Sequence, residues 1–333
     1  MAERSAAIDD FLRRAGWGDA ARTPLAGDAS FRRYVRLSAP NRTAMLMDAP
    51  PPKENVRPYL AVARQLRALG FSAPDILAED ADAGLLVIED LGDDTFTRLL
   101  AAGADAAPLY GLAIDALIAL HRRPDPVPAW LPPYDDTRLL AEAELLTEWY
   151  MPAVGAAPST AHARAYRDLW RAAFPIARAV PCTLVLRDYH VDNLMLLPRR
   201  ADIASLGLLD FQDAVRGPIT YDIMSLIEDA RLDVPDALHR AMRDRYLAAF
   251  PALDRAAFEA SLAVLGAQRH AKVIGIFTRL NVRDGKPIYL KHIPRVFRLL
   301  ERSLEHPALA ALRDWFDAAL PRELRIVPQR PAA

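Results

Sequence analysis

Two carboxylates and one amide stand at spacings that suit phosphoryl transfer. The apolar run Thr183–Leu186 leads into a loop that holds Asp188 and, five residues later, Asn193. A kinase needs a carboxylate that accepts the proton of the acceptor hydroxyl, and a nearby amide oxygen that holds Mg²⁺ on the nucleotide phosphates. After Asn193, the apolar run Gly207–Leu209 ends in a second carboxylate, Asp210. The pattern predicts Asp188 as the catalytic base, with Asn193 and Asp210 as Mg²⁺ ligands. An ordinary polar turn is the competing interpretation, and the flanking apolar runs weigh against it.

The segments that must position these residues change character near residue 90. Before it, helical spacing at 5–15 and 59–69 alternates with strand-like runs such as 43–48, 75–78 and 85–89. Beyond Gly92, helices are expected at 95–121, 135–150, 159–180, 235–250 and 255–282. The exception is 183–213, where two apolar runs flank polar turns and predict a hairpin-like element. We therefore expect an α+β fold, with a small β-rich N-lobe and a larger, mainly helical C-lobe.

Composition narrows the possible functions. The 333 residues include 42 basic and 43 acidic side chains, for a formal net charge of −1, which gives no support for nucleic-acid binding. A single cysteine, Cys182, allows neither an intrachain disulfide nor a cysteine zinc cluster. No apolar run approaches the ~18 residues of a membrane helix, and the N-terminus lacks the apolar core of a signal peptide. We expect a cytoplasmic protein that binds no membrane, and a monomer.

With these motifs in this order, the sequence resembles the aminoglycoside phosphotransferase and choline kinase branch of the kinase-like fold. That branch carries a loop of the form H-G-D-x-x-x-x-N, a later apolar-Asp-Phe/Trp, and a further Asp that supports the catalytic loop. Here Asp188, Asn193 and Asp210 match the first two, and Asp222 matches the third. The resemblance implies a protein kinase-like two-lobe fold, with ATP and Mg²⁺ as cofactors. Residues 1–90 would then form a nucleotide-covering N-lobe, and 91–333 a catalytic and acceptor-binding C-lobe.

The same resemblance implies which residues bind the nucleotide. The turn before Phe31 occupies the place of the phosphate-covering loop, and the run 86–92 matches the crossing between lobes that binds adenine through its backbone. The implied nucleotide-binding residues are Gly27, Asp28, Ala29, Ser30, Arg32, Arg33, Glu89 and Leu91.

The chain departs from the family at two positions. Leu186 replaces the histidine of the catalytic loop, and the third strand offers Met45 and Met47 where kinases place a phosphate-binding lysine. Phosphate charge must then be balanced by another cation, for which the candidates are Arg32, Arg33 and Lys53.

Within this branch the sequence most resembles anomeric kinases of cell-wall recycling, which act on N-acetylmuramate and N-acetylglucosamine. The stretches that carry the likeness include GDASFRRY, RDYHVDNLM and VIGIFTRLNVRDGKPIYL. Charge points the same way, because 266–302 holds nine basic and two acidic residues, which does not suit a polycationic aminoglycoside. The candidates for contact with this amino-sugar substrate are His190, Asp192, Trp149 and Arg283.

Two other functions remain open at this point. An aminoglycoside-modifying kinase would share all of the catalytic residues. A nucleotide-binding pseudokinase that acts as a scaffold would explain the missing lysine. A protein kinase is disfavoured because Gln212 replaces the glycine of the Asp-Phe-Gly motif.

Overall fold

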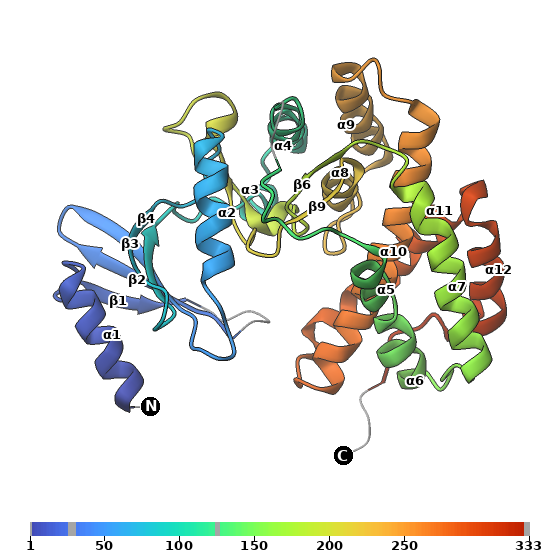
Figure 1. Ribbon diagram of the computed structural model, residues 1–333, viewed down its shortest axis with the longest axis horizontal. Coiled ribbons are helices and arrows are strands. Elements are labelled where there is room, and N and C mark those ends of the chain that lie inside the picture. The colour runs from blue at the N-terminus through green and yellow to red at the C-terminus, as the bar shows by residue number, and fades with distance from the viewer. Residues whose placement is uncertain (1, 26–30, 124–126, 330–333) are drawn as a thin grey trace. The chain divides into compact units, whose positions relative to one another are not determined.

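The computed structural model describes residues 2–25, 31–123 and 127–329, and the chain forms two compact units (Figure 1). Unit 1 comprises Met1–Ala116 and Val191–Asp213, and unit 2 comprises Leu117–His190 and Ala214–Ala333. The five-stranded sheet lies within the first ninety residues and most of the rest is helical, so the α+β class is confirmed. The lobe boundary expected after residue 90 differs from this division, in which residues 91–116 and 191–213 also belong to unit 1. The division into lobes stays a prediction. None of the helices among the described residues is both long and apolar enough to span a membrane.

Unit 1 is built on an antiparallel five-stranded sheet of order β1-β2-β3-β5-β4 (Figure 1). A tight turn joins β2 to β3, whose register runs from Arg33 opposite Asp48 to Ala39 opposite Arg42. The strands are β1 (Ala21–Pro24), β2 (Arg33–Ala39), β3 (Arg42–Asp48), β4 (Ile76–Asp80) and β5 (Leu85–Glu89). The strand expected at 43–48 is therefore present as β3.

Helix α1 covers one face of this sheet. Its residues Phe11 and Leu12, with Trp17, form a buried cluster against Leu37 and Leu46 of the strands. On the opposite face, Tyr59 of α2 lies with side chains of β2, β3 and β5 around a cavity. The helices of this unit are α1 (Ala2–Arg14), α2 (Arg57–Ala68), α3 (Phe96–Ala101) and α4 (Ala106–His121), the last of which continues into unit 2.

A second, two-stranded sheet completes unit 1. Strands β7 (Leu194–Leu196) and β8 (Leu206–Leu208) pair with each other, preceded by the 3₁₀ turn η2 (Val191–Asn193). The Leu208 amide donates to the carbonyl of Ser72, 2.9 Å away, which ties the hairpin to the segment after α2. This hairpin carries Asn193 at its start and Asp210 just after its end.

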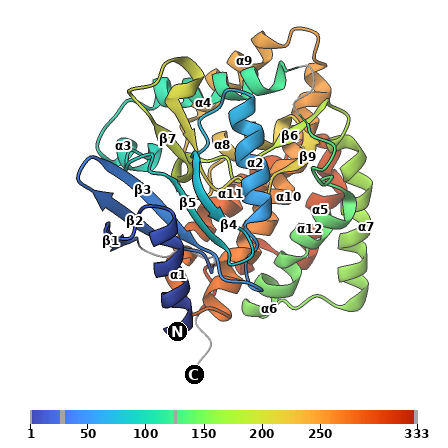
Figure 2. The ribbon, with the colours of Figure 1, turned by 60° about the vertical axis from the view of Figure 1, so that its left-hand side comes forward.

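Unit 2 is a helical assembly around α10 (Arg255–Val282), whose residues are mostly buried (Figure 2). Helices α5, α7, α8 and α11 all contact α10. The other helices of the unit are α5 (Asp136–Ala143), α6 (Met151–Ala153), α7 (Thr160–Ala177), α8 (Thr220–Ile227), α9 (Asp236–Ala249), α11 (Ile293–Leu304) and α12 (Ala310–Ala319), with a π-helical turn η1 (Leu146–Tyr150) and 3₁₀ turn η4 (Pro287–His292). Strands β6 (Cys182–Val185) and β9 (Val215–Pro218) form a separate antiparallel pair.

Three sequence expectations need correction. The segment 183–213 is not one hairpin, because β6 pairs with the later strand β9 while β7 pairs with β8. The helix expected at 95–121 is two helices, since the chain turns at Gly103, whose φ of +90° suits glycine. The helix expected at 135–150 is α5 followed by the π-helical turn. Helix α8 was not expected, because its eight residues follow Gly217 and Pro218 and give too short a periodic pattern.

Candidate active site

Unit 1 contains a cavity of about 450 Å³ on the sheet face opposite α1. Because side chains alternate along a strand, β2 places Tyr34 and Arg36 on this face, and Arg32, which directly precedes β2, also lines the cavity. Arg33 points to the other face, where it lines a different hollow with Val35. Of the two arginines expected at the nucleotide, the structure therefore brings only Arg32 to the cavity.

The apolar end of the cavity is closed by the segment that leaves β5. Met45 and Ile88 form its sheet wall, and Glu89 to Gly92 run along its edge. The Glu89 amide already donates to the Asp75 carbonyl (2.8 Å), and its carboxylate pairs with Arg200. Glu89 and Leu91 thus lie at the cavity edge that the resemblance assigns to adenine.

Arg36 of β2 holds the segment Glu89 to Asp93 against the sheet through its side-chain contacts. Its guanidinium lies 2.8 Å from the Asp90 carboxylate and donates to Asp93 (3.0 Å) and to the Gly92 carbonyl (3.2 Å). The hydrogen bond that Arg36 donates to Asp93, together with the charges of both carboxylates, raises the pKa of Arg36 despite partial burial. Sequence reasoning missed this residue, although its spacing of two residues from Tyr34 and four from Arg32 was a signal for a shared face.

The opposite end of the cavity carries the expected Mg²⁺ ligands. Asn193 and Asp210 both line it, at the two ends of the β7–β8 hairpin, and the Leu209 amide donates to the Asn193 carbonyl (3.0 Å). Asp210 has a φ of +57°, and its carboxylate accepts a hydrogen bond of 2.8 Å from Gln212. Carboxylate and amide oxygens are the ligands that Mg²⁺ prefers, so this donor set fits the ion, with phosphate oxygens and water completing its shell.

The Arg32 guanidinium lies beside these expected Mg²⁺ ligands and could take the place of the missing lysine. Met45 of β3 lines the cavity, while Arg32 lies 3.6 Å from Asp210 and 3.6 Å from Glu54. Lys53, the other candidate, lies over the ring of Phe31 at 4.7 Å. Arg32 is therefore the basic residue best placed to meet phosphate oxygens. Four expected phosphate-loop residues, Gly27, Asp28, Ala29 and Ser30, lie outside the described residues.

The loop that holds Asp188 belongs to unit 2 and is fixed by Asp222. The Asp222 carboxylate accepts hydrogen bonds from the backbone amides of Leu186 (2.7 Å) and Arg187 (2.9 Å). Asp222 is 1% exposed, and burial raises its pKa to about 7 although these two bonds favour the charged form. Asp222 was expected to support the catalytic loop, and these two hydrogen bonds to the loop backbone fit that role.

Arg187 has a left-handed backbone conformation, with φ of +70°. The corresponding position of the family pattern H-G-D is glycine, which adopts such angles without strain. Here a long side chain occupies it, and its guanidinium pairs with Glu142 on α5 and lies over the Tyr134 ring at 5.5 Å. The surrounding contacts thus hold a conformation that costs roughly 1–3 kcal/mol.

Asp188 itself lies among cations. Burial opposes its ionisation, but the charges of Arg269, Lys272, His190 and Arg187 together lower the pKa of Asp188 to about 2. Arg269 Nη2 lies 3.6 Å from Asp188 Oδ1, and the Asp188 side chain keeps 33% of its surface exposed. An accessible, ionised carboxylate is what a general base needs.

The four expected acceptor contacts lie in different places. His190 shares the Asp188 loop and is buried, with its Nε2 3.4 Å from Arg231, while Asp192 belongs to unit 1 and bonds to Thr97. Trp149 lies half-buried in the π-helical turn. Arg283 directly follows α10 and pairs with Asp284 at 2.7 Å. Burial is the main cause that lowers the pKa of His190 below its usual value.

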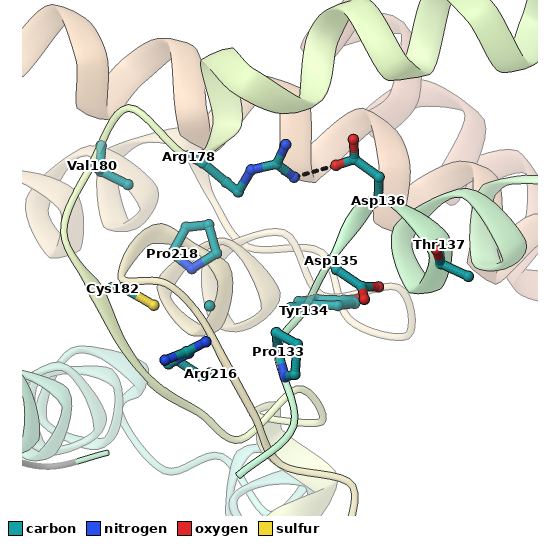
Figure 3. A pocket seen from close by; sticks show the side chains of 11 residues that line it. Pro133, Tyr134, Asp135, Asp136, Thr137, Arg178, Val180, Cys182, Arg216 and Pro218 are labelled. Carbon is teal, nitrogen blue, oxygen red and sulfur yellow. Dashed lines mark hydrogen bonds and ion pairs between the residues drawn. The ribbon is translucent and has the colours of Figure 1, made fainter. Parts of the chain in front are cut away.

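Another hollow of unit 2, of about 660 Å³, holds none of the expected site residues (Figure 3). Arg178 and Asp136 pair across it, and Cys182 and Arg216 line the side formed by β6 and β9. Tyr134 forms part of its wall, but the Tyr134 hydroxyl is turned to Glu142 and Tyr221 in the interior.

Known proteins resemble the chain over most of its length. A sequence model described as the phosphotransferase enzyme family matches residues 21–258. An N-acetylmuramate/N-acetylglucosamine kinase of Caulobacter vibrioides is 40% identical, with 97% of this chain and 98% of that protein covered. A Pseudomonas aeruginosa protein of the same name is 39% identical, covering 92% of this chain and 91% of its own.

Solved structures show the fold. An ADP-bound aminoglycoside phosphotransferase matches with a TM-score of 0.60 at 14% identity, covering 90% of this chain and 96% of its own. A choline kinase from Streptococcus pneumoniae matches with a TM-score of 0.59 at 11% identity, covering 93% and 99%. The expected kinase-like fold is thereby confirmed, while identities this low carry no substrate information.

Proposed function

We propose that this chain, which belongs to the phosphotransferase enzyme family, phosphorylates the anomeric hydroxyl of N-acetylmuramate and N-acetylglucosamine. The chain is an ATP-dependent kinase with a hydroxyl acceptor. The sugar and the reacting hydroxyl are the proposed part, and the product would be a sugar 1-phosphate that enters peptidoglycan recycling. The observation that carries the acceptor is the likeness, at 40% identity over 97% of the chain, to a kinase named for these two sugars.

We assign the nucleotide to the cavity of unit 1. Adenine would lie against Met45 and Ile88, with the phosphates toward Arg32, whose guanidinium balances their charge. Asn193 and Asp210 would hold Mg²⁺, which when bound neutralises charge on the β- and γ-phosphates. The turn at 27–30 remains a proposed phosphate contact.

We assign proton acceptance to Asp188. The anomeric hydroxyl is the most acidic hydroxyl of a reducing sugar, so a carboxylate of low pKa suffices as its base. Asp222 keeps the loop in place through the amides of residues 186 and 187. His190, Asp192, Trp149 and Arg283 stay proposed acceptor contacts.

The charges around Asp188 also favour a neutral or anionic acceptor over an aminoglycoside. Arg187, Arg269 and Lys272 all act on the Asp188 carboxylate, and a polycation would meet repulsion there. The lactyl carboxylate of N-acetylmuramate would instead be attracted. We further propose a cytoplasmic protein, because ATP is a cytoplasmic substrate. The expected monomer stays a prediction.

A substrate panel tests the proposal. The purified protein with ATP and Mg²⁺ is given N-acetylglucosamine, N-acetylmuramate and kanamycin, and ³¹P NMR reads the position of any new phosphate. We expect both amino sugars to give a 1-phosphate and kanamycin to stay unmodified. The methyl glycoside should be inert and the 6-deoxy sugar active; the reverse pattern would identify a 6-kinase and overturn the proposed acceptor.

The alternative of a nucleotide-binding pseudokinase arose from the missing third-strand lysine. Met45 of β3 lines the cavity on that strand. Arg32 beside Asp210 argues that the phosphate charge is met in another way. ATP binding without transfer to any sugar in the panel would support the pseudokinase.

A further inference from the structure

Arg269, a buried arginine on α10, contacts the loop that holds Asp188. Arg269 is 6% exposed, and a guanidinium buried to this extent is costly unless its N–H groups are satisfied. Its partners are the Arg187 carbonyl (3.0 Å), the Tyr221 hydroxyl (3.1 Å) and the Asp188 carboxylate (3.6 Å). Two of these three partners belong to the catalytic loop.

Arg269 and Asp222 hold the same peptide segment through complementary groups. Asp222 accepts the N–H of Arg187, and Arg269 donates to the carbonyl of that same residue. Since Arg187 has φ of +70°, its peptide groups must be held from outside to stay in this orientation. The direction in which the Asp188 side chain points depends on the orientation of these peptide groups.

Tyr221 in turn anchors Arg269. Its hydroxyl accepts from Arg269 Nη1, and its ring face lies 5.6 Å from the guanidinium carbon. The Tyr221 hydroxyl also meets that of Tyr134 at 3.1 Å. These contacts restrict the guanidinium to one position, 3.6 Å from Asp188 Oδ1.

We propose that Arg269 is a positioning residue for phosphoryl transfer: anchored by Tyr221, it orients the Asp188 carboxylate toward the acceptor hydroxyl. This inference rests on the proposed role of Asp188 as base. It extends that role, because it assigns a function to a residue 81 positions away that no catalytic motif contains. A guanidinium offers several fixed donors, whereas a lysine would offer one point charge.

The contact between Arg269 and Asp188 also affects the pKa of the Asp188 carboxyl. Among the groups that face Asp188, Arg269 acts most strongly in holding its pKa low, ahead of Lys272, His190 and Arg187. An opposite charge at this range lowers a carboxyl pKa by about 1–3 units. Removal of Arg269 should therefore alter the pH profile as well as the rate, which a merely structural arginine would not do.

The test compares Arg269→Lys and Arg269→Gln by steady-state kinetics from pH 3 to 8, with folding checked at each pH by circular dichroism. We expect Arg269→Gln to lower kcat by about 10²-fold with the KM for ATP unchanged, and to move the acid limb from about pH 2 into the range of about pH 3–5. Arg269→Lys should keep the acid limb of the parent protein and lose about tenfold in kcat. A folded Arg269→Gln variant with the parent's kcat and pH profile would overturn the inference.

Two further variants cover the case in which Arg269 variants do not fold. Tyr221→Phe keeps the ring and removes the anchoring hydroxyl, and we expect kcat to fall about 3–10-fold without a change in the KM for ATP. An unchanged kcat in this variant would count against the anchored geometry. Arg325→Gln is the matched control, because Arg325 is equally buried but pairs with Glu301 and Asp317; it should lower the melting temperature alone.

Asp188→Asn separates this inference from the proposed function. If Asp188→Asn remains active, the catalytic base itself has been misassigned. If Asp188→Asn is inactive while Arg269→Gln and Tyr221→Phe are normal, only the role of Arg269 fails.

Discussion

Asp222 offers a sharp test of how the catalytic loop is held. Its two carboxylate oxygens accept separate hydrogen bonds, Oδ2 from the Leu186 amide and Oδ1 from the Arg187 amide, at 2.7 and 2.9 Å. A buried donor left without a partner costs about 1–3 kcal/mol. Asp222→Asn keeps one acceptor oxygen and turns an amide NH₂ toward the other donor, so the free energy of unfolding should fall by about 1–3 kcal/mol. Asp222→Ala loses both acceptors and should cost about 2–6 kcal/mol.

Urea unfolding followed by circular dichroism measures these losses, and kinetics on the folded fraction measures the effect on the loop. We expect kcat to fall at least tenfold in Asp222→Asn with the KM for ATP little changed, because the nucleotide cavity belongs to unit 1. Glu228→Gln is the matched control: Glu228 is also a buried carboxylate, near His239 and His270, and its change should lower stability without lowering kcat. An Asp222→Asn variant with unchanged stability and kcat would refute the reasoning.

Three other predictions follow from the same contacts. Asp188→Asn should lower kcat by about 10²–10⁴-fold with nucleotide affinity, measured by calorimetry, unchanged; near-normal turnover would exclude Asp188 as the base. Asp210→Ala should abolish transfer, and Asn193→Ala should raise the Mg²⁺ concentration needed for half-maximal rate; normal Mg²⁺ titrations would remove both from the metal site. Burial lowers the pKa of His270 to about 4, below its unfolded value near 6.5, so stability is complete above pH 6.5 and is lost as the pH falls toward 4, by up to about 1.4 kcal/mol per pH unit. In urea titrations at several pH values, His270→Gln should remove that part of the slope.

The sequence was sufficient for what local patterns encode. The apolar runs before Asp188 and Asp210 predicted strands, and the third strand at 43–48 is present as β3. Side-chain periodicity depends on neighbours a few residues apart, so it survives in any fold that keeps the element. The order of the three motifs was likewise enough to indicate the family.

Strand pairing was decided only by the tertiary structure. The sequence predicted one hairpin-like element over 183–213, whereas β6 pairs with β9 and β7 with β8. Both arrangements bury the same apolar runs, so local hydrophobicity does not distinguish them. The choice depends on long-range hydrogen bonds, such as the one from Leu208 to Ser72.

The same limit applies to individual side chains of the site. Alternation at the start of β2 predicts that the consecutive residues Arg32 and Arg33 lie on opposite faces, but not which face borders a cavity. Arg269 lies 81 residues from Asp188 in the chain and matches no motif, yet the packing of α10 brings its guanidinium to 3.6 Å from that carboxylate. Sequence determined which groups are available for chemistry, and packing determined which of them act on one another, because burial and charge depend on distance in space.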